Sequence, residues 1–336
     1  MTRQAIHAEL AGEGVLEGLA LPADAQLGRL TGHASTRRFF RVTKEADSSI
    51  LVVYPKDEPT GAARYVKTAA FFQRAGIRVP RIRSLGVYAV VVEDGGEELL
   101  DRAEPARIGR LYRQAARAIV HLQRHGRRHL APNPDVGLDA ARLRQELDFM
   151  ERHALRGWLG VDRDDGSRAR VYDRLVSEIV RLPQALCHRD YHARNLLVAG
   201  DRLMVLDFQD VMSGPMLYDI VSLIWDNYCD VDPVIATETL ASFWAGCRCR
   251  IELSAAAEVP PHPVGLPPAA RQAFCLVGLQ RCLKALGTFG YQVAVVGNSE
   301  YAQFAPRTWR HASAALTALG WDDAQRQLRG FGRLQA

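Results

Sequence analysis

The chain has 336 residues, of which 48% are hydrophobic and 24% charged, and its formal net charge is +5. A chain of this size buries a large core and suggests two lobes, while no apolar run approaches the length of a membrane span. We therefore expect a cytoplasmic protein with no membrane partner, and the six cysteines, which fit no disulfide framework, are expected to be reduced. The basic residues are spread along the whole chain, which argues against a nucleic-acid partner. Nothing in the sequence indicates the oligomeric state.

The first part of the chain has the alternating pattern of β-strands. We expect strands at 27–30, 38–42 and 50–54, a helix over 62–75 that ends at Gly76, and strands at 82–85 and 88–92. Turn residues at 93–96 then break the pattern. The sequence therefore predicts a β-rich N-lobe with one helix, residues 1–93.

Beyond this lobe the apolar period changes from two to about 3.6. Amphipathic faces at 108–122, 143–150 and 171–179 predict helices. Short strands are expected at 185–187, 196–198 and 203–206, with the last two forming a hairpin among the helices. The sequence therefore predicts a helical C-lobe, residues 94–336.

Residues 188–195 read His-Arg-Asp-x-x-x-x-Asn, and Asp207 follows before a phenylalanine. This is the arrangement of the protein-kinase catalytic loop and metal-binding motif. Asp190 would orient and deprotonate an acceptor hydroxyl, while Asn195 and Asp207 would hold Mg²⁺ against the phosphates of ATP. The alternative is a set of turn residues in a polar hairpin. Two such motifs at close range after a β-rich lobe favour an α+β, two-lobed protein-kinase-like fold.

The surroundings of this motif narrow the resemblance. His192 lies two residues after Asp190, and residues 214–219 read Gly-Pro-Met-Leu-Tyr-Asp. Both features resemble the aminoglycoside phosphotransferase and choline kinase-like family. The resemblance implies that His192 lies near the γ-phosphate and that His188 and Asp219 are structural, with Asp219 accepting backbone N–H bonds from the catalytic loop. A surface histidine and an aspartate at a helix N-terminus are the alternatives.

A finer resemblance covers most of the chain. The stretches 32–42, 75–80, 207–210, 218–223 and 279–287 together resemble the bacterial N-acetylmuramate/N-acetylglucosamine anomeric kinases of cell-wall recycling. This resemblance implies that the small-molecule substrate is an amino sugar, phosphorylated at its anomeric hydroxyl, and that Asp210, Arg281 and Lys284 face it. For Lys284, a solvated helix position is the alternative.

One expected pair of residues is missing. Most kinases hold the α- and β-phosphates with a lysine on the third strand, which pairs with a glutamate from the next helix. Here the strand at 50–54 has no lysine and the helix at 62–74 has no acidic residue. The joint absence is coherent, because losing only the lysine would leave an unpaired acid. The nucleotide-anchoring charge would then come from Arg37, Arg38 or Lys56.

Two further segments are candidates for nucleotide contacts. The small residues Gly32, Ala34 and Ser35 would let backbone N–H groups approach the phosphates, although an ordinary hairpin turn has the same composition. Glu93 and Gly95 mark a hinge between the lobes whose main chain would bind adenine, and a plain linker is compatible with the same residues.

Two other functions stay open. The acceptor could be an aminoglycoside or another small alcohol, because a fold does not fix its substrate. The arginine-rich C-terminal part of the chain argues mildly against an aminoglycoside, which is a polycation. The chain could also be a pseudokinase that binds nucleotide or a protein partner without turnover. The missing lysine favours that interpretation, and the presence of Asp190, Asn195 and Asp207 opposes it.

Overall fold

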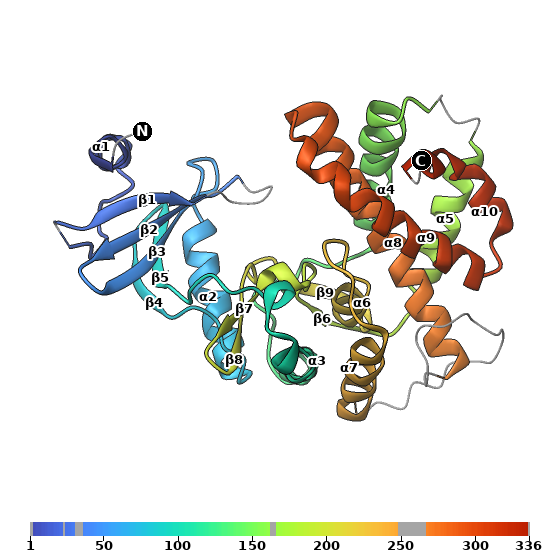
Figure 1. Ribbon diagram of the computed structural model, residues 1–336, viewed down its shortest axis with the longest axis horizontal. Coiled ribbons are helices and arrows are strands. Elements are labelled where there is room, and N and C mark those ends of the chain that lie inside the picture. Colours follow the sequence, from blue (N-terminus) through green and yellow to red (C-terminus); the bar gives the residue numbers. More distant parts are fainter. Residues whose placement is uncertain (1–2, 23, 31–35, 162–165, 248–266, 335–336) are drawn as a thin grey trace. The chain divides into compact units, whose positions relative to one another are not determined.

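The computed structural model describes residues 3–22, 24–30, 36–161, 166–247 and 267–334 (Figure 1). The chain divides into two compact units. Unit 1 comprises Met1–Glu98 and Leu197–Gln209, and unit 2 comprises Leu99–Leu196 and Asp210–Ala336. Within the described ranges, no helix combines the length and the apolar character needed to cross a membrane.

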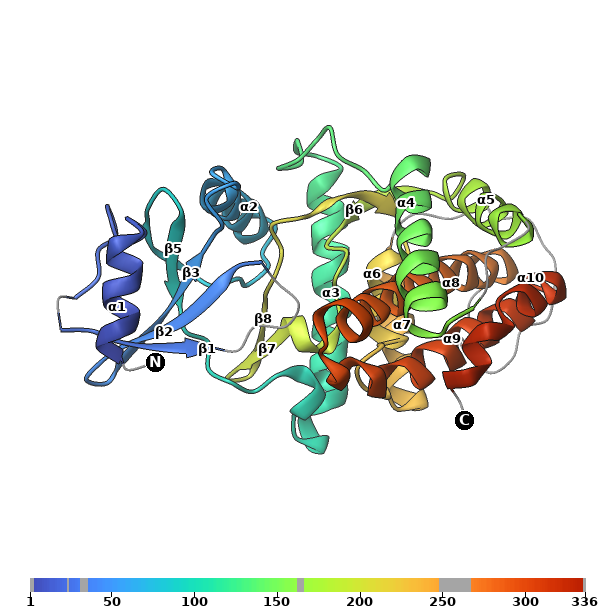
Figure 2. The same ribbon diagram turned by 90° about the horizontal axis from the view of Figure 1, so that it is seen from above.

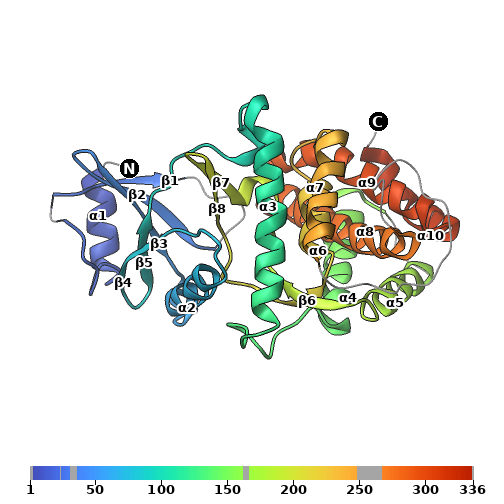
Figure 3. The same cartoon turned by 90° about the horizontal axis from the view of Figure 1, so that it is seen from below.

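Unit 1 is built on a five-stranded antiparallel sheet with the strand order β1-β2-β3-β5-β4. Helices α1 and α2 lie on opposite sides of this sheet (Figures 2 and 3). Leu51 and Val53 of β3 pack in a core that includes Leu10 of α1, and Val52, between them in sequence, is buried on the other face. The predicted strands are confirmed to within three residues. The elements are α1 (Arg3–Gly12), β1 (Gln26–Leu30), β2 (Arg38–Lys44), β3 (Asp47–Val53), α2 (Gly61–Arg74), β4 (Ile82–Leu85) and β5 (Ala89–Glu93).

A hairpin of β7 (Leu196–Ala199) and β8 (Arg202–Val205) follows the catalytic loop. The sequence places this hairpin among the helices, but residues 197–209 cluster with unit 1 instead. The backbone N–H of Val205 donates to the carbonyl of Arg78 at 2.9 Å. Phe208 packs on Tyr65 and Phe72 of α2, with ring centroids 4.6 and 5.3 Å apart. These contacts attach the metal-binding motif to the sheet unit.

Unit 2 is mostly helical, and its longest helix, α8, packs against α4 and α9 (Figure 1). Two glycines permit a close approach on α8: a Cβ atom at Gly287 would lie 2.8 Å from the Cα of Met150, and one at Gly290 would lie 2.5 Å from the Cα of Ala154. The helices are α3 (Pro105–Gly126), α4 (Ala140–Met150), α5 (Ser167–Ile179), α6 (Tyr218–Ile224), α7 (Pro233–Gly246), α8 (Pro268–Tyr291), α9 (Ala305–Ala318) and α10 (Asp322–Gln327). Shorter turns are η1 (Leu100–Arg102), η3 (Ala193–Asn195), η5 (Ser299–Phe304) and η6 (Arg329–Leu334), with π-helical segments η2 (Glu151–Trp158) and η4 (Gln292–Val296).

A small antiparallel pair of strands positions the catalytic loop. β6 (Gln184–Cys187) pairs with β9 (Met212–Pro215), and Cys187 lies opposite Met212. Because β6 ends at Cys187, the catalytic loop begins at a fixed point of the helical unit.

Candidate active site

The start of the catalytic loop is held by a buried carboxylate. Arg189 has a φ of +81°, in the left-handed region that non-glycine residues seldom adopt. The backbone N–H groups of His188 and Arg189 donate to the two oxygens of Asp219, at 2.7 and 2.9 Å. Asp219 lies in the first turn of α6 and is fully buried. Burial raises its pKa above the ordinary value, while the charge of His188 and the two N–H donors act in the opposite direction. Asp219 thus fixes an unusual backbone conformation one residue before Asp190.

The end of the loop is held in the same way by a second carboxylate. Asp226 accepts the backbone N–H of Ala193 at 2.7 Å and that of Tyr228 at 2.8 Å. Its side chain is 1% exposed. Asp226 is not among the residues that the sequence motifs predict, although an acidic residue directly after the mostly apolar run 220–225 was the available signal. The loop is therefore braced on both sides of Asp190 by buried acids that are close together in sequence.

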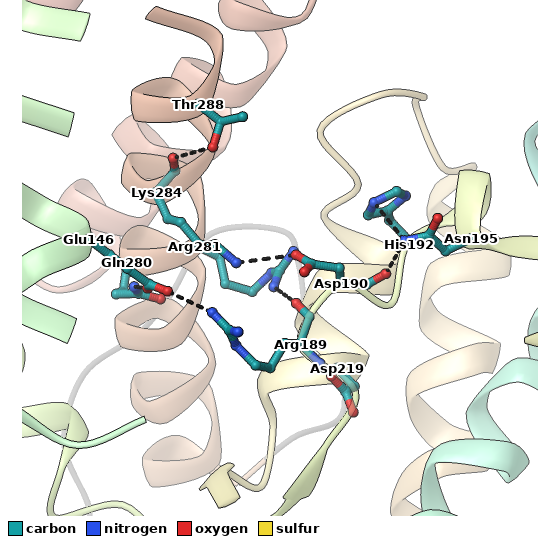
Figure 4. A network of polar contacts seen from close by, with 10 residues as sticks. All are labelled: Glu146, Arg189, Asp190, His192, Asn195, Asp219, Gln280, Arg281, Lys284 and Thr288. Carbon is teal, nitrogen blue, oxygen red and sulfur yellow. Dashed lines mark hydrogen bonds and ion pairs between the residues drawn. The ribbon is translucent and has the colours of Figure 1, made fainter. Parts of the chain in front are cut away.

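Asp190 itself forms an ion pair with Lys284 of α8, with 3.2 Å between Nζ and Oδ1 (Figure 4). The Asp190 side chain remains 41% exposed, and that of Lys284 is 21% exposed. Although burial acts to raise the pKa of Asp190, the charges of Lys284, Arg189 and Arg281 outweigh it and hold the pKa far below its usual range. Burial acts to lower the pKa of Lys284, and the charge of Asp190 raises it above its usual value. Both partners are therefore charged at neutral pH.

Three neighbouring side chains of α8, those of Gln280, Arg281 and Lys284, lie beside the loop (Figure 4). Arg281 donates to the carbonyl of Arg189 at 2.6 Å, and Gln280 donates to Glu146 at 2.6 Å. Glu146 also accepts from the Arg189 guanidinium at 2.9 Å. The resemblance implies that Arg281 faces the sugar; in the structure Arg281 is 6% exposed and its guanidinium is bonded to the loop backbone. Glu146 and Gln280 carry no signal in the sequence, because glutamate and glutamine are common on any helix.

The remaining polar residues of the loop surround Asn195. Its Nδ2 donates to the carbonyl of Asp190 at 2.8 Å and lies 3.4 Å from Nε2 of His192. The amide oxygen therefore points away from that carbonyl (Figure 4). The His192 ring packs on Tyr228, with centroids 4.8 Å apart. His188 is 1% exposed and lies against Tyr191, which agrees with a structural position.

In unit 1, Asp207 adopts a φ of +55°, another left-handed conformation at a non-glycine residue. Such conformations cost free energy and often occur at functional sites. Its Oδ1 accepts from Nη2 of Arg37 at 2.5 Å and from Nε2 of Gln209 at 2.9 Å. The Asp207 side chain is 35% exposed. Arg37, one of the three candidates for the nucleotide-anchoring charge, is therefore in contact with the candidate metal ligand.

The other two cations lie elsewhere on unit 1. Arg38 pairs with Glu9 of α1, at 2.9 Å, and with Glu13, which follows that helix. Lys56 is exposed. The turn residues Gly32, Ala34 and Ser35 lie outside the described residues.

The hinge candidates Glu93 and Gly95 lie in unit 1, and Asp210, the third sugar candidate, lies in unit 2. Glu93 accepts from Arg78 at 3.0 Å, so its carboxylate is engaged within unit 1. Gly95 lies against the β7–β8 hairpin, where a Cβ atom would come within 2.2 Å of a methyl group of Leu197. Asp210 is exposed and interacts electrostatically with Arg189 in unit 2.

Two side chains have the donor chemistry that Mg²⁺ requires. Asn195 uses its amide nitrogen within the loop, which leaves its amide oxygen available as an acceptor, and Asp207 offers a partly exposed carboxylate. Among the described residues, no group of three or more His, Cys, Asp or Glu side chains could hold a metal ion. A site with one or two protein oxygens fits Mg²⁺, which fills its octahedron with phosphate oxygens and water.

A sheet unit, a helical unit and a His-Arg-Asp loop held at both ends define a protein-kinase-like phosphotransferase. The chain belongs to the phosphotransferase enzyme family, whose model matches residues 27–250. A curated relative from Pseudomonas aeruginosa, named N-acetylmuramate/N-acetylglucosamine kinase, is 29% identical over 311 residues, which are 90% of this chain and 87% of the relative. The resemblance that the sequence indicates is thereby confirmed.

Solved structures of kinases share the fold. A choline/ethanolamine kinase family protein from Mesorhizobium loti has a TM-score of 0.60 at 15% identity, and the match covers 100% of this chain and 99% of that one. The amicoumacin kinase hAmiN, solved with AMP-PNP and Ca²⁺, also has a TM-score of 0.60, at 14% identity, with coverages of 99% and 96%. The predicted α+β kinase-like fold is confirmed.

Proposed function

We propose that this protein transfers the γ-phosphoryl group of ATP to the anomeric hydroxyl of N-acetylmuramate or N-acetylglucosamine. The observation that carries the proposal is Asp190: a partly exposed, ionised carboxylate on a loop whose backbone is fixed from both sides. The name of the Pseudomonas aeruginosa relative supports the amino-sugar acceptor.

Asp190 would accept the hydrogen of the acceptor hydroxyl and align its oxygen with the γ-phosphate. A carboxylate whose pKa is held this low is a weak base. The loose transition state of phosphoryl transfer requires little from the base, so orientation matters more than proton affinity. An anomeric hydroxyl is more acidic than an ordinary alcohol, because the ring oxygen withdraws electrons. The site therefore suits a hemiacetal acceptor better than a simple alcohol.

ATP and Mg²⁺ are part of this proposal. Asn195, through its amide oxygen, and Asp207, through its carboxylate, would hold the ion. When bound, Mg²⁺ offsets the negative charge that spreads over the transferred oxygens. The complex of hAmiN with AMP-PNP and Ca²⁺ supports a nucleotide and a divalent ion in a protein of this fold.

The charge around Asp190 disfavours an aminoglycoside as the acceptor. Lys284, Arg189 and Arg281 all act on this carboxylate, and Arg281 and Lys284 come from the same face of α8. A polycation bound here would be repelled by the side chains that hold the loop. A neutral or anionic sugar would not.

A screen of ADP release tests the proposal. Wild-type protein with ATP and Mg²⁺ is given N-acetylglucosamine, N-acetylmuramate, choline and kanamycin in turn. We expect turnover with the two amino sugars, a loss of about 10² to 10⁴ in kcat for Asp190→Asn, and ATP affinity within about twofold of wild type. Asp148→Asn, in an exposed i,i+4 pair with Arg144, serves as the matched control and should keep full activity. Turnover with choline or kanamycin alone would reassign the acceptor, and turnover with none of the four would refute the proposal.

A further inference from the structure

Because the strand-3 lysine is missing, another cation would have to hold the nucleotide phosphates. The sequence offers Arg37, Arg38 and Lys56. Arg38 is engaged with two glutamates of the N-terminal segment, and Lys56 is exposed. A cation that acts on phosphates next to Asp207 must lie close to that carboxylate, and of these three Arg37 is bonded to it.

Arg37 has the surroundings of a functional charge rather than of a surface arginine. Its side chain is 14% exposed. The guanidinium lies beside the Tyr54 hydroxyl, which follows β3, and 5.6 Å from the ring centroid of Phe39 on β2. Burial raises the pKa of Tyr54 to about 12, so its hydroxyl is neutral and polar at physiological pH. The ring of Tyr54 packs closely against Gly61, where a Cβ atom would come within 2.2 Å of it.

We propose that Arg37 supplies the phosphate-binding charge that other kinases place on strand β3, and that Asp207 holds this charge in position until nucleotide binds. This inference rests on the proposed function, since it requires a nucleotide. An Mg²⁺ ion held by Asp207 would also bind phosphate oxygens, so a guanidinium bonded to Asp207 would lie close to those oxygens. The planar fork of arginine also suits bidentate contact with a phosphate.

The arrangement keeps charge balanced in both states. Without nucleotide, Arg37 neutralises much of the Asp207 charge. With nucleotide, Asp207 would face the metal ion and Arg37 would face the phosphates, so neither side chain would be left unpaired. An unpaired buried charge is costly, which explains why a glutamate on α2 is not needed: Asp207 takes the place of that partner.

Calorimetric titration of the unliganded protein with ADP, AMP and adenosine tests the proposal, first in EDTA and then with Mg²⁺. In EDTA, Arg37→Met should weaken ADP binding by about 10- to 100-fold, the loss expected for a charge-assisted contact with phosphate. Adenosine binding should stay within twofold. Arg37→Lys should recover part of the loss, because it keeps the charge but not the fork. Arg83→Met, which breaks an exposed arginine–aspartate pair on β4, is the matched control and should bind ADP as wild type does.

The measurement in EDTA separates phosphate binding from a structural role. If Arg37 only orients Asp207, Arg37→Met will leave metal-free ADP binding unchanged and reduce only the gain that Mg²⁺ provides, and the proposal is wrong. A loss in Arg38→Met in place of Arg37→Met also overturns it. If Arg37→Met folds poorly, Arg37→Met combined with Asp207→Asn removes both charges and should show the same loss in EDTA. Wild-type protein that binds no nucleotide would overturn the proposed function as well, whereas normal ADP binding by the Arg37 variants would overturn this inference alone.

Discussion

The carboxylate of Asp219 offers the clearest test of how the catalytic loop is held. Replacing it by asparagine keeps the size of the side chain and one acceptor oxygen, but puts an NH₂ group against the second backbone N–H. One of the two bonds, at 2.7 and 2.9 Å, is then lost, and a buried donor is left unsatisfied.

The loss in free energy of unfolding follows from these two contacts. A hydrogen bond to a charged group contributes about 1.5 to 3 kcal/mol, and an unsatisfied buried donor costs a similar amount. We therefore expect Asp219→Asn to lower the free energy of unfolding by about 2 to 3 kcal/mol, which corresponds for a chain of 336 residues to a Tm lower by roughly 3 to 4 °C. The left-handed conformation of Arg189 would relax, and a shift of about 1 Å at Asp190 should reduce kcat by about 10²-fold.

Thermal unfolding and steady-state kinetics measure the two effects in one preparation. Asp139→Asn is the matched control, because Asp139 also accepts a backbone N–H, at 2.8 Å from Arg142, but does so at the exposed N-terminus of α4. Asparagine caps a helix as well as aspartate does, so this variant should change neither Tm nor kcat. Asp219→Asn with unchanged kcat would refute the idea that this carboxylate positions the loop.

Three further outcomes are expected. Lys284→Met should lower kcat by about 10- to 100-fold with ADP affinity unchanged, because Asp190 loses its ion-pair partner. Lys284→Arg should restore part of the lost kcat. If Lys284→Met raises only the KM for the sugar, Lys284 is a sugar ligand instead. Although burial acts to raise the pKa of Glu151, its hydrogen bonds from Arg168 and Tyr172 lower it, so this stabilisation is present above the unfolded pKa of about 4.3 and is lost as pH falls through the lower folded value. The Tm difference between wild type and Glu151→Gln should therefore be large at neutral pH and shrink below pH ~4.3, and a difference independent of pH would contradict this. Gly287→Ala should destabilise the protein by about 1 to 3 kcal/mol, because the new Cβ would meet the Met150 backbone at 2.8 Å. Gly109→Ala on α3, where the nearest neighbour would lie at 3.7 Å, should be neutral or stabilising. Equal effects of the two substitutions in chemical denaturation would contradict the close packing on α8.

Much of the fold follows from local patterns. The strands of unit 1 alternate between two buried faces, and Gly76, with a φ of +76°, follows the end of α2 as its position in the sequence predicts. The placement of the β7–β8 hairpin did not follow, because the contact of Val205 with Arg78 and that of the following Phe208 with α2 join residues more than a hundred positions apart. The periodicity of apolar residues does not predict such long-range partners.

The sequence likewise predicts only some of the residues of the site. A motif reveals Asp190, Asn195 and Asp207 because kinase chemistry requires those residue types at that spacing. It does not reveal Asp226 or Glu146, which act on the loop through contacts that only the folded chain brings together. It also does not separate Arg37 from Arg38: the two are adjacent in sequence, but one reaches Asp207 and the other reaches Glu9 and Glu13.

The position of the transferred phosphoryl group tests the central claim most directly. N-acetylglucosamine labelled with ¹³C at its anomeric carbon is converted with ATP and Mg²⁺, and the ³¹P spectrum of the product is recorded. We predict that the new phosphorus signal is split by the labelled carbon and that Asp190→Asn produces no such signal. An unsplit signal, from phosphate on another hydroxyl, would contradict the account.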